Sequence, residues 1–142
     1  MIHTDLKPEN ILLVSSSFNM VPSQSAPTKT RRALINTDLK LIDFGSTIFE
    51  TDYHSTVVCT RHYRAPEIVL GMDWSFPCDM WSIGCVLLEL YTGEALFQTH
   101  ENLEHLAMME KILGPIPQKM RDGCVFSLAP HLCDLVIDWS FF

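Results

Sequence analysis

Two short apolar runs flank a long polar stretch in the first third of the chain. The first run, residues 11–14, follows Asn10 at once, and the second, residues 39–42, leads directly into Asp43. Apolar runs of this length are typical of strands that are buried in a core. We therefore predict two short buried strands joined by a loop, a pairing that brings Asn10 close to Asp43.

Longer apolar patterns follow in the second half and predict two helices. Residues 77–92 begin with Pro77, which suits a first helical turn, and are followed by Gly93, which suits a helix end. Their apolar side chains occupy nearly every side, so this helix is expected in the middle of a domain. A second helix is predicted over residues 99–113, with Thr99 as its N-cap.

The polar stretch between the two predicted strands, residues 15–37, is rich in serine and contains the basic run Lys29-Thr30-Arg31-Arg32. Its composition predicts an exposed excursion, most simply a floppy hairpin insertion. A basic address read by a nuclear import factor is a second interpretation, although four residues with one threonine among them make a short signal.

The composition narrows the function classes. The 142 residues suffice for one modest domain, and the formal net charge of −7 argues against a non-specific nucleic-acid binder. The five cysteines include no C-x-x-C pair, which favours a reducing compartment over a disulfide or zinc framework. The apolar final stretch, residues 125–142, is interrupted by proline, histidine and aspartates, so no membrane span is expected there.

The candidate chemistry lies at the front of the chain. Asp5 offers a carboxylate, Lys7 a cation and Asn10 an amide oxygen within six residues. Together with the Asp43 carboxylate, the Asn10 amide oxygen makes a hard oxygen ligand pair that suits Mg²⁺. The alternative is a solvated polar loop between two core strands.

Three motifs in this order resemble the protein-kinase signature. They are Asp5-Leu6-Lys7-Pro8-Glu9-Asn10, Asp43-Phe44-Gly45 and Ala65-Pro66-Glu67. The resemblance implies that Asp5 orients and deprotonates a substrate hydroxyl and that Lys7 faces the transferring phosphate of ATP. It further implies that Asn10 and Asp43 hold Mg²⁺.

The same resemblance makes residues 43–67 the activation segment. Thr60 matches the threonine that bonds the catalytic Asp and Lys, whereas simple solvation is the alternative for each hydroxyl of the segment. Arg64 matches an arginine of the cyclin-dependent and MAP kinase group, and we expect it to help in substrate docking. Asp79 is expected to bond back to the catalytic loop, to act as a helix-start carboxylate, or both. His3 and Glu67 are expected to give structural support.

One further motif narrows the resemblance to a subfamily. Residues 104–111 spell E-H-L-A-M-M-E-K, one residue away from the E-H-L-A-M-M-E-R that names the LAMMER, or CDC-like, kinases. From spacing alone this stretch is an amphipathic core helix with methionines as gap-fillers. With the motif, the chain resembles a LAMMER kinase similar to the plant members.

The resemblance spans about residues 2–119, and both ends depart from the family pattern. No G-x-G-x-x-G occurs, and the small lobe that carries this loop, its lysine and its helix glutamate is not found before His3. After Met120 the pattern changes, and the arginine that pairs with Glu67 in the family is not recognised. We expect a truncated product: residues 1–119 as a partial kinase domain and residues 120–142 as a divergent tail.

The expected fold is therefore mainly α with a small β-hairpin, a partial kinase-like C-terminal lobe. The expected function is Ser/Thr, or dual-specificity, phosphorylation of Arg/Ser-rich splicing factors in the nucleus with ATP and Mg²⁺, without direct nucleic-acid or membrane contact. Thr4 stands where most kinases have arginine, so activation is not expected to depend on a phosphate bound there. For the chain alone we expect little activity. A non-catalytic docking fragment and an unstable product without function stay open as alternatives.

Overall fold

The computed structural model describes residues 1–24 and 28–124. Residues 125–142, including Cys133 and the stretch for which a membrane span was not expected, lie outside the described residues. The described residues form two compact units: Met1–Lys7 together with residues 44–124, and Pro8–Asp43.

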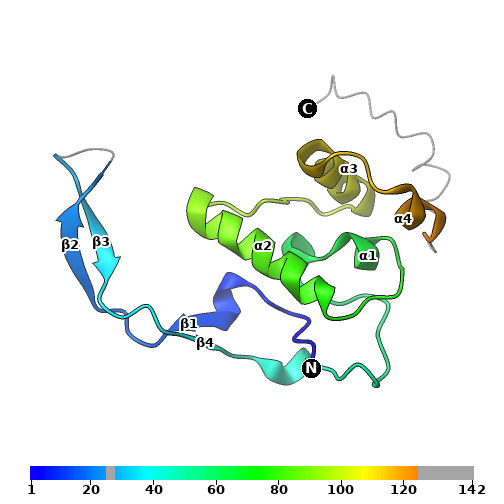
Figure 1. Cartoon of the computed structure of the whole chain (residues 1–142), viewed down its shortest axis with the longest axis horizontal. Coiled ribbons are helices and arrows are strands. Elements are labelled where there is room, and N and C mark those ends of the chain that lie inside the picture. Colours follow the sequence, from blue (N-terminus) through cyan, green and yellow to red (C-terminus); the bar gives the residue numbers. More distant parts are fainter. Residues whose placement is uncertain (25–27, 125–142) are drawn as a thin grey trace. The chain divides into compact units, whose positions relative to one another are not determined.

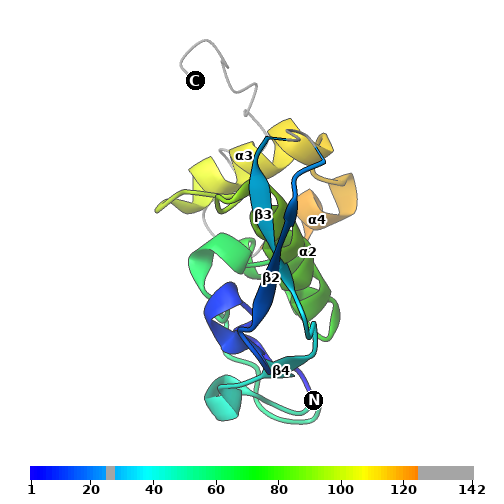
Figure 2. The ribbon, with the colours of Figure 1, turned by 90° about the vertical axis from the view of Figure 1, so that its left-hand side faces the viewer.

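The unit Pro8–Asp43 consists of two antiparallel strand pairs that follow a short 3-10 turn, η1 (Pro8–Asn10). Strand β1 (Ile11–Leu13) pairs with β4 (Leu39–Leu41), and Ile11 lies opposite Leu41. In the chain between β1 and β4, strand β2 (Phe18–Pro22) pairs with β3 (Thr30–Leu34) along five registered positions (Figures 1 and 2). The two predicted strands are therefore confirmed, and the polar stretch between them forms a hairpin of its own.

The expected burial of these strands is wrong. The side chains of Leu12, Leu13, Leu39 and Leu41 are between 42% and 59% exposed. In the described part of this unit each sheet has two strands, so a strand's neighbour covers its backbone edge but not its faces. On the outer hairpin the basic run is exposed, and the Arg32 guanidinium lies 4.9 Å from the centre of the Phe18 ring.

The other unit is helical. Up to residue 124 it contains two short 3-10 turns and four helices: η2 (Phe44–Ser46), η3 (Arg61–Tyr63), α1 (Pro66–Val69), α2 (Pro77–Thr92), α3 (Asn102–Leu113) and α4 (Gln118–Asp122). Helix α2 has the predicted bounds, and Gly93 ends it with φ = +88°, a conformation that glycine adopts without strain. None of the helices among the described residues is long and apolar enough to span a membrane.

The core of this unit forms around the start of α2. Ile2, Ala65, Ile68, Trp74 and Cys78 make one buried cluster. Further along α2, the Trp81 ring stacks on Phe97 at 5.9 Å, and α1 contacts α3.

The prediction that α2 is buried on all sides is wrong. Its residues Met80, Leu87, Leu90 and Tyr91 are 62% to 89% exposed, and no described element of this unit covers them. The spacing of apolar residues indicates which sides of a helix are apolar, but it does not specify whether a neighbouring element covers each side.

The predicted start of the second helix is also wrong. Helix α3 begins at Asn102, and Glu101 is its N-cap. Thr99 is buried two residues earlier, where its hydroxyl accepts a hydrogen bond from the Glu101 amide at 3.2 Å and donates one to the Glu104 carboxylate. Thr99 therefore fixes the turn that leads into α3 without capping the helix itself.

Candidate active site

The first residues of the chain are fixed by one carboxylate of α2. Asp79 accepts hydrogen bonds from the backbone amides of His3 at 2.7 Å and Thr4 at 3.0 Å. Thr4 adopts a left-handed backbone with φ = +65°, which is costly for a β-branched residue and needs outside support. The expected bond from Asp79 to the front loop is therefore present, and Asp79 lies in the first turn of α2 as well.

The Asp5 carboxylate is held on both of its oxygens. Its Oδ1 accepts hydrogen bonds from the Thr60 hydroxyl at 2.6 Å and from the Thr60 amide at 3.2 Å. Its Oδ2 forms an ion pair with Lys7 Nζ at 2.8 Å, and Lys7 Nζ also donates to the Thr60 hydroxyl at 3.2 Å. Three side chains from two distant segments thus form one closed triangle, which we call the Asp5 triangle.

This arrangement changes the acidity of Asp5. Partial burial by itself would raise the pKa of the carboxyl group, but the hydrogen bonds from Lys7 and Thr60 and the Lys7 charge outweigh it. The pKa of Asp5 therefore lies below its ordinary value, and the group is ionised at neutral pH. An ionised carboxylate with fixed oxygens can accept a hydrogen bond from an approaching hydroxyl.

The beginning of the activation segment contacts the first residues of the chain. Ile2 and Ile48 exchange both backbone hydrogen bonds, at 2.8 and 3.0 Å. The Thr4 hydroxyl donates to the Ser46 carbonyl at 2.8 Å, and the His3 ring lies 5.2 Å from the Phe44 ring. His3 thus contacts both the segment and, through its amide, Asp79. Its expected supporting role is compatible with these contacts.

Arg64 binds the backbone of its own segment. Its Nε donates to the Val58 carbonyl at 2.9 Å, and one terminal nitrogen donates to the Cys59 carbonyl at 2.8 Å. Burial, followed by the nearby Arg61 charge, lowers the pKa of Arg64. Two of its donors are therefore occupied within the segment, and the docking role of Arg64 stays a prediction.

Glu67 lies in the first turn of α1. Its side chain forms no hydrogen bond or ion pair within the part of the chain that the structure describes. Its expected supporting role stays a prediction.

Asn10 and Asp43 both belong to the unit Pro8–Asp43. The Asn10 carbonyl accepts a hydrogen bond from the Ile42 amide at 3.0 Å, which extends the β1–β4 pairing by one step. Asn10 and Asp43 therefore adjoin the same end of this strand pair, and an amide oxygen with a carboxylate fits the donor set of Mg²⁺. This ion commonly takes one or two carboxylates and completes its shell with water and phosphate oxygens.

Sequence reasoning missed one further chain of contacts. The Ser82 hydroxyl of α2 donates to the Tyr63 carbonyl at 2.8 Å, and the Tyr63 hydroxyl donates to the Glu89 carboxylate at 2.6 Å. These bonds fasten the end of the activation segment along α2. Two features of the sequence could have indicated these contacts. Tyr63 lies between Thr60 and Ala65, and Ser82 and Glu89 are polar residues in an otherwise apolar helix.

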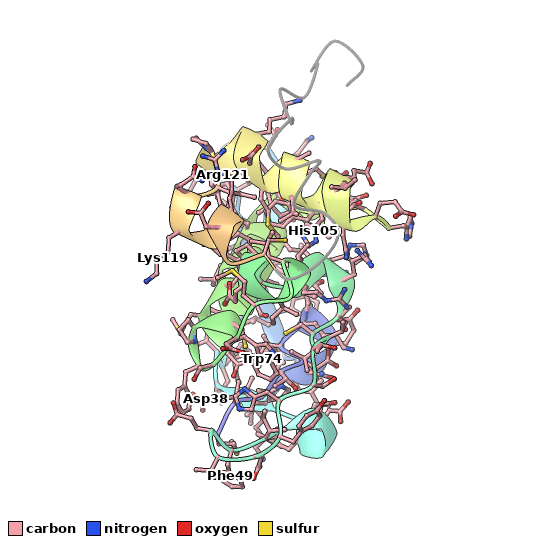
Figure 3. The ribbon with its side chains drawn as sticks, turned by 90° about the vertical axis from the view of Figure 1, so that its right-hand side faces the viewer. Asp38, Phe49, Trp74, His105, Lys119 and Arg121 are labelled. Carbon is pink, nitrogen blue, oxygen red and sulfur yellow. The ribbon has the colours of Figure 1, made fainter. Side chains whose placement is uncertain are left out.

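The E-H-L-A-M-M-E-K stretch forms most of α3, and its two glutamates accept hydrogen bonds from residues outside the helix. Glu104 binds Thr99 before the helix, and the Glu110 carboxylate accepts the Ile116 amide at 2.9 Å after it. His105 is fully buried, with its ring 5.1 Å from Phe97, and it projects from α3 within this unit (Figure 3). The burial of His105 lowers its pKa to about 4, so its ring is neutral at neutral pH.

Comparison with known proteins decides the family. The protein kinase domain family matches residues 1–136. The chain belongs to the protein kinases. The serine/threonine-protein kinase AFC1 of Arabidopsis thaliana is 61% identical over 127 residues, which cover 84% of this chain and 27% of that protein. The dual specificity protein kinase CLK4 of Homo sapiens is 58% identical over 120 residues, covering 84% of this chain and 25% of that protein.

These relatives are LAMMER-type kinases, which confirms the expectation from the E-H-L-A-M-M-E-K motif. A crystal structure of a kinase domain superimposes with a TM-score of 0.78 at 46% identity, over 92% of this chain and 42% of that one. The partial kinase fold is thereby confirmed. The chain spans about a quarter of the length of these curated relatives. The predicted boundary at Lys119 stays a prediction, and the family match continues beyond it.

Proposed function

We propose that this chain carries the hydroxyl-binding part of a LAMMER-type kinase, which transfers the γ-phosphate of ATP to serine or threonine. The Asp5 triangle is the observation that carries this proposal, because it fixes an ionised carboxylate between a cation and a hydroxyl. A protein catalyses phosphoryl transfer mainly by positioning the reacting groups and stabilising the charge of the transition state. The Asp5 carboxylate would position the hydroxyl, and the Lys7 ammonium would stabilise the charge.

Each residue then has a distinct task. Asp5 accepts the hydrogen bond of the substrate hydroxyl, orients it and takes its proton as the phosphate transfers. Lys7 directs a positive charge at the transferring phosphate, and Thr60 prevents the Asp5 carboxylate from rotating. Asn10 and Asp43 would hold Mg²⁺, which supplies charge neutralisation for the phosphates of ATP when it is bound.

The proposed substrates are Arg/Ser-rich splicing factors, and the proposed location is the nucleus. Both follow from the subfamily resemblance. The formal net charge of −7 supports the substrate class, since an acidic protein attracts a basic substrate during encounter.

The 142 residues alone are proposed to have little or no kinase activity. They contain no G-x-G-x-x-G to cover the phosphates of ATP. Purified chain incubated with Mg·ATP and an Arg/Ser-rich peptide is therefore expected to give no transfer above that of the Asp5→Asn variant. Robust transfer that depends on Asp5 would contradict this part of the proposal.

A chimera tests the function itself. The aligned stretch of human CLK4 is replaced by residues 1–124 of this chain, and transfer to the same peptide is measured. We expect the chimera to be active and Asp5→Asn to lower its kcat by a factor of roughly 10² to 10⁴, the usual range for a general base. An exposed change, Asp73→Asn, serves as the matched control and should leave kcat unchanged.

Two outcomes would count against the proposal. A folded chimera that is equally active with Asp5→Asn would remove Asp5 from the chemistry. A folded chimera that binds the peptide with normal affinity but transfers nothing would favour the docking alternative. Circular dichroism of each chimera decides whether it is folded.

A further inference from the structure

Two cysteines pack in the buried core of the unit that contains the Asp5 triangle. Cys59 packs against the buried cluster that contains Cys78, and the Cys59 thiol is the largest cause that raises the pKa of Cys78. Cys59 is half-buried and Cys78 is fully buried, and both are free thiols. Neither has a task in the proposed phosphoryl transfer.

Each of the two cysteines directly precedes a residue that holds Asp5 or the backbone before it. Cys59 directly precedes Thr60, whose hydroxyl and amide bind Asp5. Cys78 directly precedes Asp79, which holds the amides of His3 and Thr4. The two cysteines are therefore the immediate chain neighbours of the residue that fixes the Asp5 carboxylate and of the residue that fixes the backbone before Asp5.

The backbone at Cys59 is strained, and the side chain of Arg64 in the same segment holds it in place. Its φ is +64°, a left-handed conformation that is rare for a residue other than glycine. Arg64 stabilises this conformation by donating to the Cys59 carbonyl at 2.8 Å and to the preceding Val58 carbonyl. A new covalent bond at the Cys59 sulfur has to be accommodated by this strained segment, and Thr60 is the next residue in it.

We propose that Cys59 and Cys78 form a reversible disulfide under hydroperoxide, and that this bond displaces Thr60 from Asp5. Cys59 is more accessible than Cys78 and meets the oxidant first. Its sulfur attacks one peroxide oxygen, the O–O bond breaks, and the other oxygen leaves with a proton as water or an alcohol. The product at Cys59 is a sulfenic acid.

Cys78 completes the reaction. Its sulfur attacks the Cys59 sulfur, the S–O bond breaks, and hydroxide leaves as water with the Cys78 proton. In total, two thiols and one hydroperoxide give one disulfide, one water, and one further water or alcohol. The two sulfurs supply the two electrons that reduce the peroxide. In the reduced pair the Cys59 thiol, and then burial, raise the pKa of Cys78. Oxidation of Cys59 removes the first of these causes, so Cys78 gives its proton to the leaving oxygen more readily once Cys59 is a sulfenic acid.

Peptide mapping tests the site in the purified chain. The chain is treated with hydrogen peroxide, remaining thiols are alkylated, and tryptic peptides are analysed by mass spectrometry. We expect residues 41–61 cross-linked to residues 65–111 with the loss of two hydrogens, and we expect dithiothreitol to reverse it. Because Cys78 and Cys85 share one tryptic peptide, Cys85→Ala is the matched control and should keep the cross-link. Cys59→Ser and Cys78→Ser should each abolish it.

Two further outcomes would overturn the disulfide. Oxidation of Cys59 to sulfinic acid without a cross-link would show that Cys78 does not reach it. A cross-link formed equally well in urea would show that the fold does not direct the pairing. Circular dichroism of the reduced variants separates a lost cross-link from a lost fold.

Hydrogen exchange tests the structural effect without relying on kinase activity. The Thr60 amide, which donates to Asp5, is expected to exchange at least tenfold faster after oxidation. The Ile48 amide, which donates to Ile2, is the internal control and should not change. Unchanged exchange at Thr60 in the cross-linked chain would refute the displacement, whether or not the chain is part of a kinase.

Discussion

At the scale of single residues, the Asp5 carboxylate depends on a partner 55 positions away. Lys7 is near in sequence and supplies charge, but a lysine side chain has many rotamers and does not fix a carboxylate by itself. Thr60 contributes a hydroxyl and an amide to one oxygen, and therefore leaves the carboxylate only one orientation. The position of Thr60 before Ala-Pro-Glu made this contact predictable from the sequence resemblance, whereas the amide bond was visible only in the structure.

The Thr60 hydroxyl can be removed with little change in shape. Thr60→Val is expected to raise the pKa of Asp5 towards the ordinary value of 3.8, because one hydrogen bond to the charged form is lost. The carboxyl carbon of Asp5, followed by NMR during an acid titration, reports this pKa. Thr56→Val removes an exposed hydroxyl instead and should leave the Asp5 titration unchanged.

The same variant has a defined effect on stability. A carboxyl group whose pKa is lower in the folded chain stabilises the fold above its unfolded pKa and loses this contribution as the pH falls through the folded pKa. The stability difference between the native chain and Thr60→Val should therefore be largest at neutral pH and shrink in acid. A difference that is constant down to the lowest folded pH would contradict the assigned hydrogen bond.

At the scale of elements, the start of α2 organises the site. Asp79 receives two backbone donors from the front of the chain, and His3 and Thr4 are 5% and 1% exposed, so water cannot replace it there. The bounds of α2 were predictable because Pro77 and Gly93 act locally. The start of α3 was not, because the Thr99 hydroxyl bonds Glu104 and the true N-cap, Glu101, has no side-chain capping bond.

Removal of the Asp79 carboxylate should destabilise the chain. Asp79→Ala leaves two buried amides without acceptors, and at about 1 kcal/mol or more for each amide we expect a loss of about 2 kcal/mol or more. Asp79→Asn keeps one acceptor oxygen and should lose roughly half as much. Urea unfolding measures both, and Asp73→Ala, which removes an exposed carboxylate nearby, should stay within about 0.5 kcal/mol of the native chain. Equal stability of Asp79→Ala and Asp73→Ala would remove Asp79 from its supporting role.

At the scale of the whole molecule, the fold class could be predicted and the covering of apolar surfaces could not. The kinase motifs are local sequences, so their order identified the family before any contact was known. Burial depends on which elements meet, and the predicted buried strands and fully buried α2 both proved partly exposed. Large exposed apolar patches on a soluble protein favour association with another surface.

The exposed side of α2 should make the chain self-associate. Leu87 and Leu90 are 62% and 69% exposed on one helix, and burying them between two copies removes apolar area from water. Sedimentation of the native chain should therefore show a mass that increases with concentration, and the double variant Leu87→Lys with Leu90→Lys should remain monomeric over the same range. Added positive charge alone also changes the solubility of an acidic chain. The control is therefore Gln98→Lys with His100→Lys, two exposed positions outside α2 that receive the same two lysines. If this control abolished association as completely as the α2 variant, net charge and not the apolar helix face would drive it.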